Sequence, residues 1–256
     1  MISFIIPAHN EEAHLPGTLA AVRGVIAELG LEAEIVVADD ASTDRTPEIA
    51  RAFAASAAPI PVVLVRHERR QISATRNLGY RASKGAMCVF VDADTLVNAP
   101  VVRAAIELMD GGAVGGGCLM NFEGRVPMHA RMLAGCFLVW MRLCNFCGAA
   151  FLFARREALE RVAAASEMES QRTAGPWDES VFAGEEIVLA KALKKVGRFR
   201  LTPSRTRATT SGRKLRTYSL AEMLGFFWRA SIGGRRFLKD RANLGLWYDE
   251  RRRDPG

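Results

Sequence analysis

The amino-acid sequence predicts an α/β protein with a mostly parallel, doubly wound sheet and helices on both faces. Two observations support this fold class. Short apolar runs alternate with helical patterns through the first 110 residues, and strands that alternate with helices are joined by right-handed crossovers into parallel pairs. Polar clusters also follow three of the predicted strands, at the end of the sheet where ligands bind in this class of fold.

The helices and strands follow from hydrophobic periodicity. Residues 12–29 carry an apolar stripe at helical spacing and predict the first helix. Strands are predicted at residues 2–6, 34–38, 62–65, 86–92 and 148–153, and further helices at residues 46–53, 72–83, 185–197 and 217–232. The apolar stretch 132–154 begins with a helix that is buried or interfacial, because its longest uninterrupted run is nine residues and a spanning helix needs ~20.

A D-x-D motif, Asp92 and Asp94, closes the apolar run of residues 86–90. Residues two apart in a strand point to the same side, so we expect the two carboxylates to converge at the carboxyl end of the strand. Such a pair suits Mg²⁺ or Mn²⁺, which can bridge the phosphates of a nucleotide and neutralise a leaving diphosphate. The alternative is that both residues only end the strand and cap the next helix.

Composition narrows the class of protein. A chain of 256 residues that is 49% hydrophobic can bury one large core or two small ones. The five cysteines are scattered, as expected for free thiols in a reducing cytosol. The short apolar run 2–6 is followed at once by polar residues, so no secretory leader is expected. These observations predict a cytoplasmic protein.

The positive charge is concentrated near the C-terminus. Residues 198–256 contain 15 Lys and Arg against 5 Asp and Glu, a balance of +10, which leaves −3 of the total +7 for residues 1–197. No nucleic-acid motif accompanies this charge. Aromatic and aliphatic residues are interleaved with the arginines, which favours an anionic membrane surface and a peripheral position at the inner face of the membrane. A solvated basic tail is the alternative.

Several short motifs occur in an order that resembles family 2 glycosyltransferases of GT-A fold. They are residues 7–12 (PAHNEE), 37–46 (VADDASTDRT), 74–79 (ATRNLG) and 92–94 (DAD), followed by 148–159, 177–179 (WDE) and 184–197. The resemblance covers about residues 1–200. It implies a GT-A catalytic domain over 1–200, with a nucleotide-binding half at 1–110 and an acceptor half at 111–200. Residues 201–256 would form a basic helical extension.

The resemblance implies transfer of a sugar from a nucleotide-diphosphate donor, UDP- or GDP-linked, to an acceptor hydroxyl, with inversion and with Mn²⁺ or Mg²⁺ as cofactor. The donor pocket would include Pro7, Ala8, His9 and Glu11, with Asp40 as hydrogen-bond acceptor for the base and Arg76 facing the base or phosphates. Asp92 would approach ribose and metal, and Asp94 would bind the metal. These roles are chemically sensible, because a carboxylate accepts from an imide N–H and an arginine fork fits phosphate oxygens.

An inverting transferase needs a general base that deprotonates the acceptor hydroxyl. In the family this base usually comes from a Glu-Asp pair at the start of the helix predicted here at 185–197. This chain has Glu185-Glu186, so Glu186 occupies the position of the base with one extra methylene, and Glu185 stays open as the alternative. Arg213 or Lys214 would stabilise the departing diphosphate.

Two other functions remain as alternatives. A nucleotide-binding or membrane-docking protein without catalysis is one, favoured only by the Glu-Glu pair. A sugar-nucleotide nucleotidyltransferase is the other, but residues 7–12 lack the Gly-rich basic loop that such enzymes carry after the first strand. A lipid-linked or envelope glycan is a plausible acceptor. The donor sugar, the choice between Mg²⁺ and Mn²⁺, and a homodimer are left open by the sequence.

Overall fold

The computed structural model of the 256-residue chain describes residues 1–124, 128–148, 150–170 and 175–217, together with 222, 225, 228, 229 and 237–240. The strands are β1 (Ile2–Ala8), β2 (Ala33–Asp40), β3 (Val62–His67), β4 (Met87–Val91), β5 (Thr95–Leu96), β6 (Gly115–Gly117), β7 (Leu119–Glu123), β8 (Phe151–Arg155), β9 (Phe199–Leu201) and β10 (Arg207–Ser211). The helices are α1 (Leu15–Leu29), α2 (Thr46–Ser56), α3 (Ile72–Ala82), α4 (Ala99–Asp110), α5 (Met128–Leu143), α6 (Arg156–Ser170), α7 (Glu185–Val196) and α8 (Arg213–Thr217).

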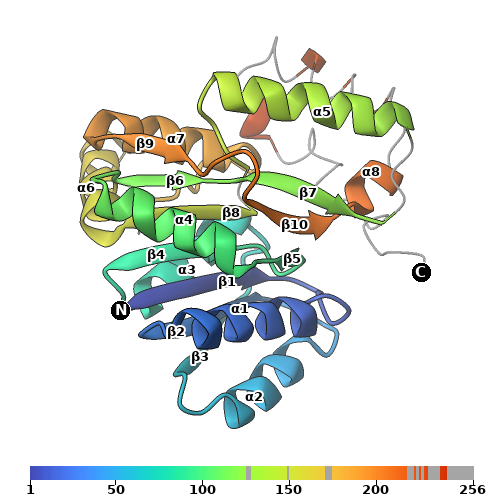
Figure 1. The fold of residues 1–256 in the computed structure, drawn as a ribbon, viewed down its shortest axis with the longest axis vertical. Helices are drawn as coiled ribbons and strands as arrows, with labels where there is room; N and C mark the ends of the chain where they lie inside the picture. Colours follow the sequence, from blue (N-terminus) through green and yellow to red (C-terminus); the bar gives the residue numbers. More distant parts are fainter. Residues whose placement is uncertain are drawn as a thin grey trace.

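A seven-stranded sheet with the order β3-β2-β1-β4-β8-β6-β9 forms the centre of the molecule (Figure 1). Strands β1 to β4 pair in parallel, and β8 is the antiparallel strand between β4 and β6. The predicted α/β class with a mostly parallel sheet is therefore confirmed. Because β1, β2 and β4 run the same way, the polar segments that follow them meet at one edge of the sheet.

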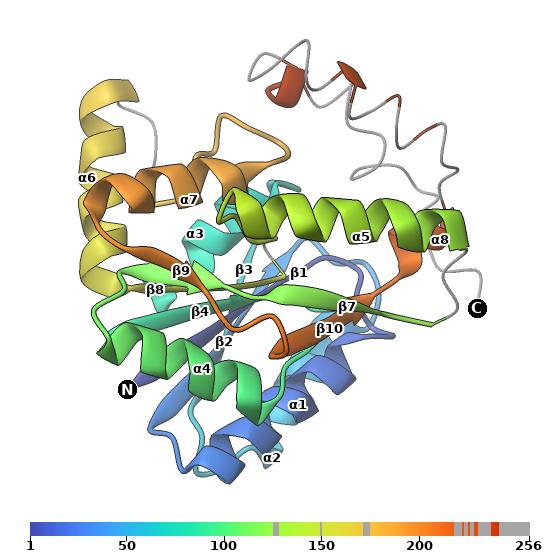
Figure 2. The same cartoon turned by 45° about the horizontal axis from the view of Figure 1, so that its top comes forward.

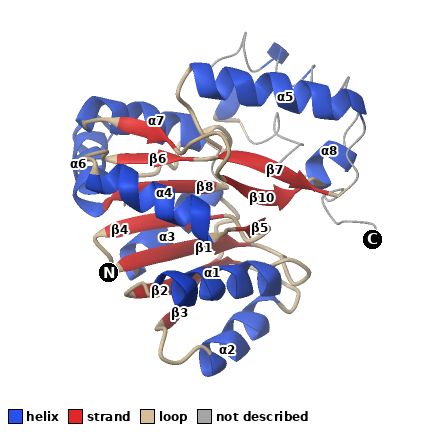
Figure 3. Ribbon diagram, viewed as in Figure 1, coloured by secondary structure: helices blue, strands red, loops and turns tan. Residues whose placement is uncertain are grey.

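Helices cover both faces of this sheet, as Figure 3 shows by its colours. Alternate residues of each strand enter different cores: Phe4 and Ile6 pack with α1 and α4, whereas Ile5 packs with α3, α6 and α7. This division follows from the period of two along a strand. Strands β1, β2 and β4 are buried on both sides, which explains why they are almost continuously apolar in sequence.

A second sheet, with the order β5-β10-β7, stands beside the carboxyl edge of the first. The chain passes from β6 in the first sheet to β7 in the second with only Cys118 between them. Strand β10 is parallel to β7 and antiparallel to β5. The segment after residue 200 was predicted as a helical extension; the described part of it contains β10, which pairs with β7 and β5. The division of the chain at residue 200 stays a prediction.

The predicted elements differ from the observed ones mainly at their ends. The first helix begins at Leu15 rather than residue 12, and the strand expected at 148–153 is β8, which runs from Phe151 to Arg155. Helix α5 begins four residues before the predicted start. The helix predicted at 217–232 lies largely outside the described residues. Element ends are set by loop contacts and caps, which periodicity does not contain.

The close pairing of β6 with β9 generates a first prediction. A Cβ at Gly116 would lie 1.8 Å from the carbonyl oxygen of Arg200, whereas a Cβ at Gly24 on α1 would meet nothing within 4 Å. Gly116→Ala is therefore expected to lower the free energy of unfolding by about 2–3 kcal/mol. Gly24→Ala should raise it by up to about 1 kcal/mol, because alanine favours a helix interior. Urea unfolding of both variants measures this, and equal stabilities would contradict it.

Candidate functional site

The loops after β1 and β2 are fastened to each other at the carboxyl edge of the sheet. Asn10 has a left-handed φ of 54°; its Oδ1 accepts the Thr43 N–H at 2.8 Å, and its own N–H donates to the Ser42 hydroxyl at 2.9 Å. The N–H of Glu11 donates to the Thr46 hydroxyl at 2.8 Å. These bonds bring the two polar segments side by side, as the parallel strands predicted.

Asp40 ends β2 and holds the start of α3. Its Oδ1 accepts the Arg70 N–H at 2.6 Å, and its Oδ2 accepts the Gln71 N–H at 2.7 Å and lies 2.8 Å from the Thr75 hydroxyl. Burial alone would raise the pKa of Asp40, but hydrogen bonds from His67, Thr75 and the backbone lower it to about 2. The carboxylate is ionised and its acceptor positions are largely used by the chain. A nucleotide base would have to donate to a carboxylate that already accepts hydrogen bonds from these three groups. The role of Asp40 in base recognition therefore stays a prediction.

Arg76 is a buried cation with only 2% of its side chain exposed. Its Nη2 donates to Asp92 at 2.8 Å and its Nη1 to Glu185 at 2.5 Å, while the guanidinium lies 4.6 Å from the ring centre of Trp177. Burial alone would lower the pKa of Arg76, but the two carboxylates raise it further above its usual range. Arg76 is thus no surface charge. Both Nη groups bind carboxylates, and contact with the base or phosphates, as the resemblance implied, stays a prediction.

The two glutamates at the start of α7 have different surroundings. Glu185 is buried and bound to Arg76. Glu186 is partly buried, and its pKa is raised to about 8, first by burial and then by the neighbouring Glu185 carboxylate. Sequence spacing left open which of them serves as a base. The structure distinguishes a buried glutamate that is paired with Arg76 from a neighbouring carboxyl group whose pKa is raised.

The D-x-D residues lie in a turn rather than in a strand. Strand β4 ends at Val91, so strand alternation does not set the direction of the two side chains. Asp92 binds Arg76, whereas Asp94 contacts Arg213 and lies 3.3 Å from the Thr210 hydroxyl. The two carboxylates lie at one edge of the sheet, as expected, but each forms an ion pair with a different arginine.

Arg213 comes to this edge from the start of α8, 202 positions after its partner Glu11. Its Nη2 donates to Glu11 at 2.9 Å and to Asp94 at 3.3 Å. Glu11 also lies 3.4 Å from the Nδ1 of His14, and its hydrogen bond raises the pKa of that histidine. Strand β10 positions Arg213 here, because Arg213 is the first residue of α8, which starts two residues after β10 ends. Of the two basic residues expected near the diphosphate, the structure describes the side chain of Arg213 but not that of Lys214 in α8.

The remaining predicted donor residues are placed as follows. Pro7 and Ala8 lie buried at the end of β1. The Nδ1 of His9 lies 2.5 Å from the carbonyl oxygen of Asp40. All three are next to the fastened loops, and their contact with a nucleoside stays a prediction.

The chemistry of the D-x-D pair fits a divalent metal. Within the described ranges, no three His, Cys, Asp or Glu side chains are grouped so that they could hold a metal by themselves. Asp92 and Asp94 still offer hard oxygen ligands on side chains that are 33% and 19% exposed. Mg²⁺ is commonly held by one or two carboxylates and completed by substrate phosphates. These two residues would hold a metal that arrives with a diphosphate.

Trp177 and Asn77 were not assigned a role by the sequence, although both lie in motifs of the resemblance. Asn77 accepts the N–H of Trp177 at 3.0 Å and donates to its carbonyl oxygen at 2.9 Å. This pair fixes the indole under Arg76. The adjacency of Asn77 to Arg76 was the available signal, but no pattern reveals a contact between residues 100 positions apart.

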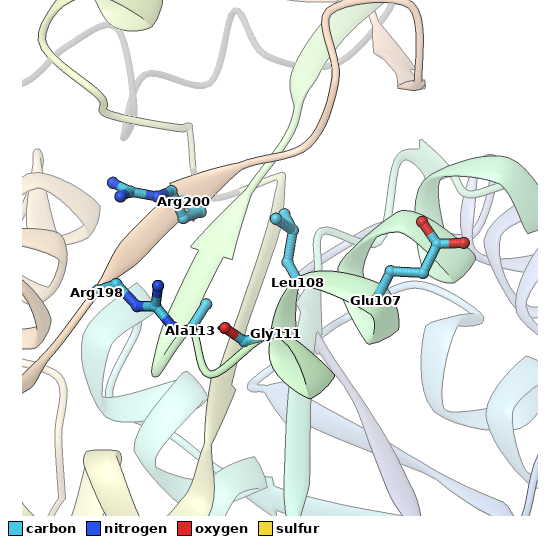
Figure 4. Close-up of a pocket in the computed structure, with 6 residues that line it drawn as sticks. All are labelled: Glu107, Leu108, Gly111, Ala113, Arg198 and Arg200. Atoms are coloured by element: carbon cyan, nitrogen blue, oxygen red, sulfur yellow. Dashed lines mark hydrogen bonds between the residues drawn. The ribbon is translucent and has the colours of Figure 1, made fainter.

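A pocket of about 200 Å³ opens elsewhere, between the end of α4 and strand β9 (Figure 4). It is lined by Glu107, Leu108, Gly111, Ala113, Arg198 and Arg200. Arg198 is held there by the carbonyl oxygen of Gly111 at 2.6 Å. The pocket lies at the beginning of β6 and contains none of the predicted site residues.

This architecture is that of the GT-A class of glycosyltransferase folds. Mannosyltransferase PcManGT from Pyrobaculum calidifontis, solved with GDP-Man and Mn²⁺, is similar with a TM-score of 0.62 and 20% identity, covering 93% of this chain and 62% of that one. Glucosyl-3-phosphoglycerate synthase from Mycobacterium tuberculosis, solved with Mn²⁺, UDP and phosphoglyceric acid, is similar with a TM-score of 0.56 and 18% identity. The match covers 94% of this chain and 80% of that one. At these identities the likeness concerns the fold.

Residues 3–162 match the family described as Glycosyl transferase family 2. The chain belongs to this family, and the predicted enzyme class is confirmed. Undecaprenyl-phosphate 4-deoxy-4-formamido-L-arabinose transferase of Pseudomonas aeruginosa is 35% identical over 100 residues, 39% of this chain and 29% of that protein. Glycosyltransferase AglE of Haloferax volcanii is 30% identical over 113 residues, which are 44% of this chain and 36% of that protein. The matches thus span about a third of the length of these relatives.

The buried ion pairs of Arg76 generate a second prediction. Arg76→Met leaves two carboxylates without their cation, and is expected to lower the free energy of unfolding at pH 7 by about 3–5 kcal/mol. Arg51→Met is the control, because Arg51 pairs with Glu48 at the surface, and should change stability by less than about 1 kcal/mol. The added change Glu185→Met should restore part of the loss. Denaturant unfolding measures all three, and a loss below that of the control would refute the assignment.

Proposed function

We propose that this family 2 glycosyltransferase moves a sugar from a nucleotide-diphosphate donor, with UDP or GDP as the nucleotide, to an acceptor hydroxyl, with inversion at the anomeric carbon. One observation carries the proposal. Both D-x-D aspartates meet an arginine at the carboxyl edge of the sheet, and Arg76 links one of them to the Glu185-Glu186 pair. Carboxylates for a metal, cations for phosphates and a carboxyl group with raised pKa are thus within one site.

The donor would lie over the fastened loops. Residues at the end of β1 and the ionised Asp40 would contact the nucleoside. A divalent metal on Asp92 and Asp94 would neutralise charge on the diphosphate. Arg213 would donate to a phosphate oxygen, since its guanidinium already lies beside Asp94 and an arginine fork fits phosphate geometry. GDP-Man and UDP in the similar structures support a nucleoside-diphosphate donor without choosing between the bases.

Glu186 is the residue that we assign as the general base. A base works best when its pKa lies near the working pH, and Glu186 meets that condition. Glu185 is less suited, because it is buried and its carboxylate is already bound to Arg76. In this assignment Glu186 takes the proton of the acceptor hydroxyl as that oxygen bonds to the anomeric carbon, while the bond from this carbon to the diphosphate oxygen breaks and the nucleoside diphosphate leaves. The neighbouring Glu185 carboxylate raises the pKa of Glu186 and therefore its basicity.

A lipid-linked acceptor is the class that the relatives favour. The Pseudomonas aeruginosa relative is named as a transferase that acts on undecaprenyl phosphate. Because the match covers a minor part of that protein, this acceptor and a cytoplasmic location at the membrane are proposals for the present chain.

Nucleotide binding tests the donor site. In calorimetry with UDP, GDP, CDP and dTDP, one nucleotide should bind in the presence of Mn²⁺, and Asp94→Ala should weaken that binding by about tenfold or more through the loss of a metal ligand. Asp110→Ala, at the exposed end of α4, is the control and should bind as the unchanged protein does. Failure of all four nucleotides to bind would remove the donor site and, with it, the proposed reaction.

The pH dependence of transfer tests the base. Glu186 must be ionised to accept a proton, and its pKa is about 8, so kcat/KM should rise with pH below about 8 and level off above it. Glu186→Gln should lower kcat by about 100-fold or more while the affinity for the nucleotide is retained. A flat profile from pH 6 to 9, or unchanged turnover in the variant, would exclude this residue. Nucleotide binding without any transfer in the unchanged protein would identify a catalytically inactive binding protein.

A further inference from the structure

Helix α5 is apolar on two opposite sides, and within the described part of the chain only one of them packs against the core. Met141 and Leu138 face the core formed with α6 and α7. In Figure 1, α5 and α2 lie at opposite ends of the main sheet, and Figure 2 shows the same arrangement turned by 45°. A helix that is apolar all round is normally surrounded by other apolar groups. We therefore expect the outer side of α5 to contact another apolar surface.

The exposed apolar residues of α5 form a continuous stripe. We define the α5 stripe as Met128, Met132, Cys136, Val139 and Leu143, all of them exposed. At 3.6 residues per turn, these positions fall within about 80° of one another around the helix axis. The four large side chains among them are 60% to 79% exposed. Scattered exposed apolar residues are normal on a protein, but an aligned row of five marks an interaction surface.

Charged and aromatic residues border the α5 stripe in the pattern of an interfacial helix. Arg131 and Arg142 are exposed and lie along the same border, within about 60° of the stripe. Trp140 lies at the other border, 45% exposed, with its ring stacked on Phe146. Arginine extends its charge toward lipid headgroups from a buried stem, and tryptophan favours the boundary between water and acyl chains. Helix α5 contains no Asp or Glu.

We propose that the α5 stripe docks this protein onto an anionic lipid surface, with α5 parallel to the membrane plane. Among the described residues, no helix is long and apolar enough to cross a bilayer, so α5 would lie on the membrane rather than in it. Residues 198–256 add a net charge of +10, and the exposed Trp228 in that segment is followed by an exposed arginine. Anionic headgroups complement these charges.

A second copy of the chain fits the same surface less well. Two-fold pairing of α5 with its copy would place the same patch on both sides of the interface. In an antiparallel pairing the arginine border of one helix would face the arginines of the other, with no acidic residue on α5 to neutralise them. Repulsion of this kind disfavours the pairing, whereas an anionic bilayer is attracted by the same residues.

Vesicle flotation of the full chain tests the proposal independently of catalysis. The protein should float with vesicles of 70% phosphatidylcholine and 30% phosphatidylglycerol and much less with phosphatidylcholine alone, and binding should weaken at high salt. Met132→Gln with Val139→Gln removes apolar contact without changing charge, and should lower the bound fraction by about tenfold or more. Arg131→Gln with Arg142→Gln should reduce the preference for anionic vesicles.

The matched control is Ala52→Gln with Ala55→Gln, which changes two exposed residues of α2 and should leave flotation unaltered. Circular dichroism melting and nucleotide affinity of each variant show that the fold and the donor site are intact. Flotation of the Met132→Gln, Val139→Gln variant equal to that of the unchanged protein would overturn the proposal. So would a soluble dimer that this variant converts to a monomer, because that result assigns the stripe to a second copy.

Discussion

The guanidinium of Arg76 connects three parts of the chain that the sequence keeps far apart. From its place in α3 it binds Asp92 after β4 and Glu185 at the start of α7, and it lies over the indole of Trp177. A buried carboxylate without a partner costs several kcal/mol, so the three charges stabilise the fold only as a set. Arg76 keeps one D-x-D carboxylate next to the Glu185-Glu186 pair. It thereby joins the D-x-D turn, which is suited to a donor, to the start of α7, which is suited to an acceptor.

Arg213 forms a second bridge of the same kind. It links Asp94 to Glu11 and so connects the D-x-D turn to the loop after β1. The two bridges divide the D-x-D pair between them, and each arginine compensates the repulsion of the two carboxylates that it contacts. The second bridge depends on the small sheet, because β10 carries the chain to Arg213 by pairing with β5 and β7.

Local patterns predicted most of the fold and the meeting of several polar segments at one edge of the sheet. Buried parallel strands such as β1 and β4 are almost entirely apolar, so they were recognisable, and the polar segments after them had to meet at one edge. Contacts between distant residues were not predictable. Nothing in the sequence near Arg213 indicates a bond to Glu11, and residues 207–211 have no apolar alternation that distinguishes a strand. The different surroundings of Glu185 and Glu186 likewise arise from Arg76, which lies on another helix.

The first turn of α3 connects the end of β2 to Arg76. Asp40 binds the backbone of Arg70 and Gln71 and lies against Thr75, the residue before Arg76. Asp40 is thus connected to Glu185 through Arg76 and less than two turns of a single helix. The end of β2 and the start of α7 are therefore both positioned by α3, which bonds to one at its first turn and to the other through Arg76.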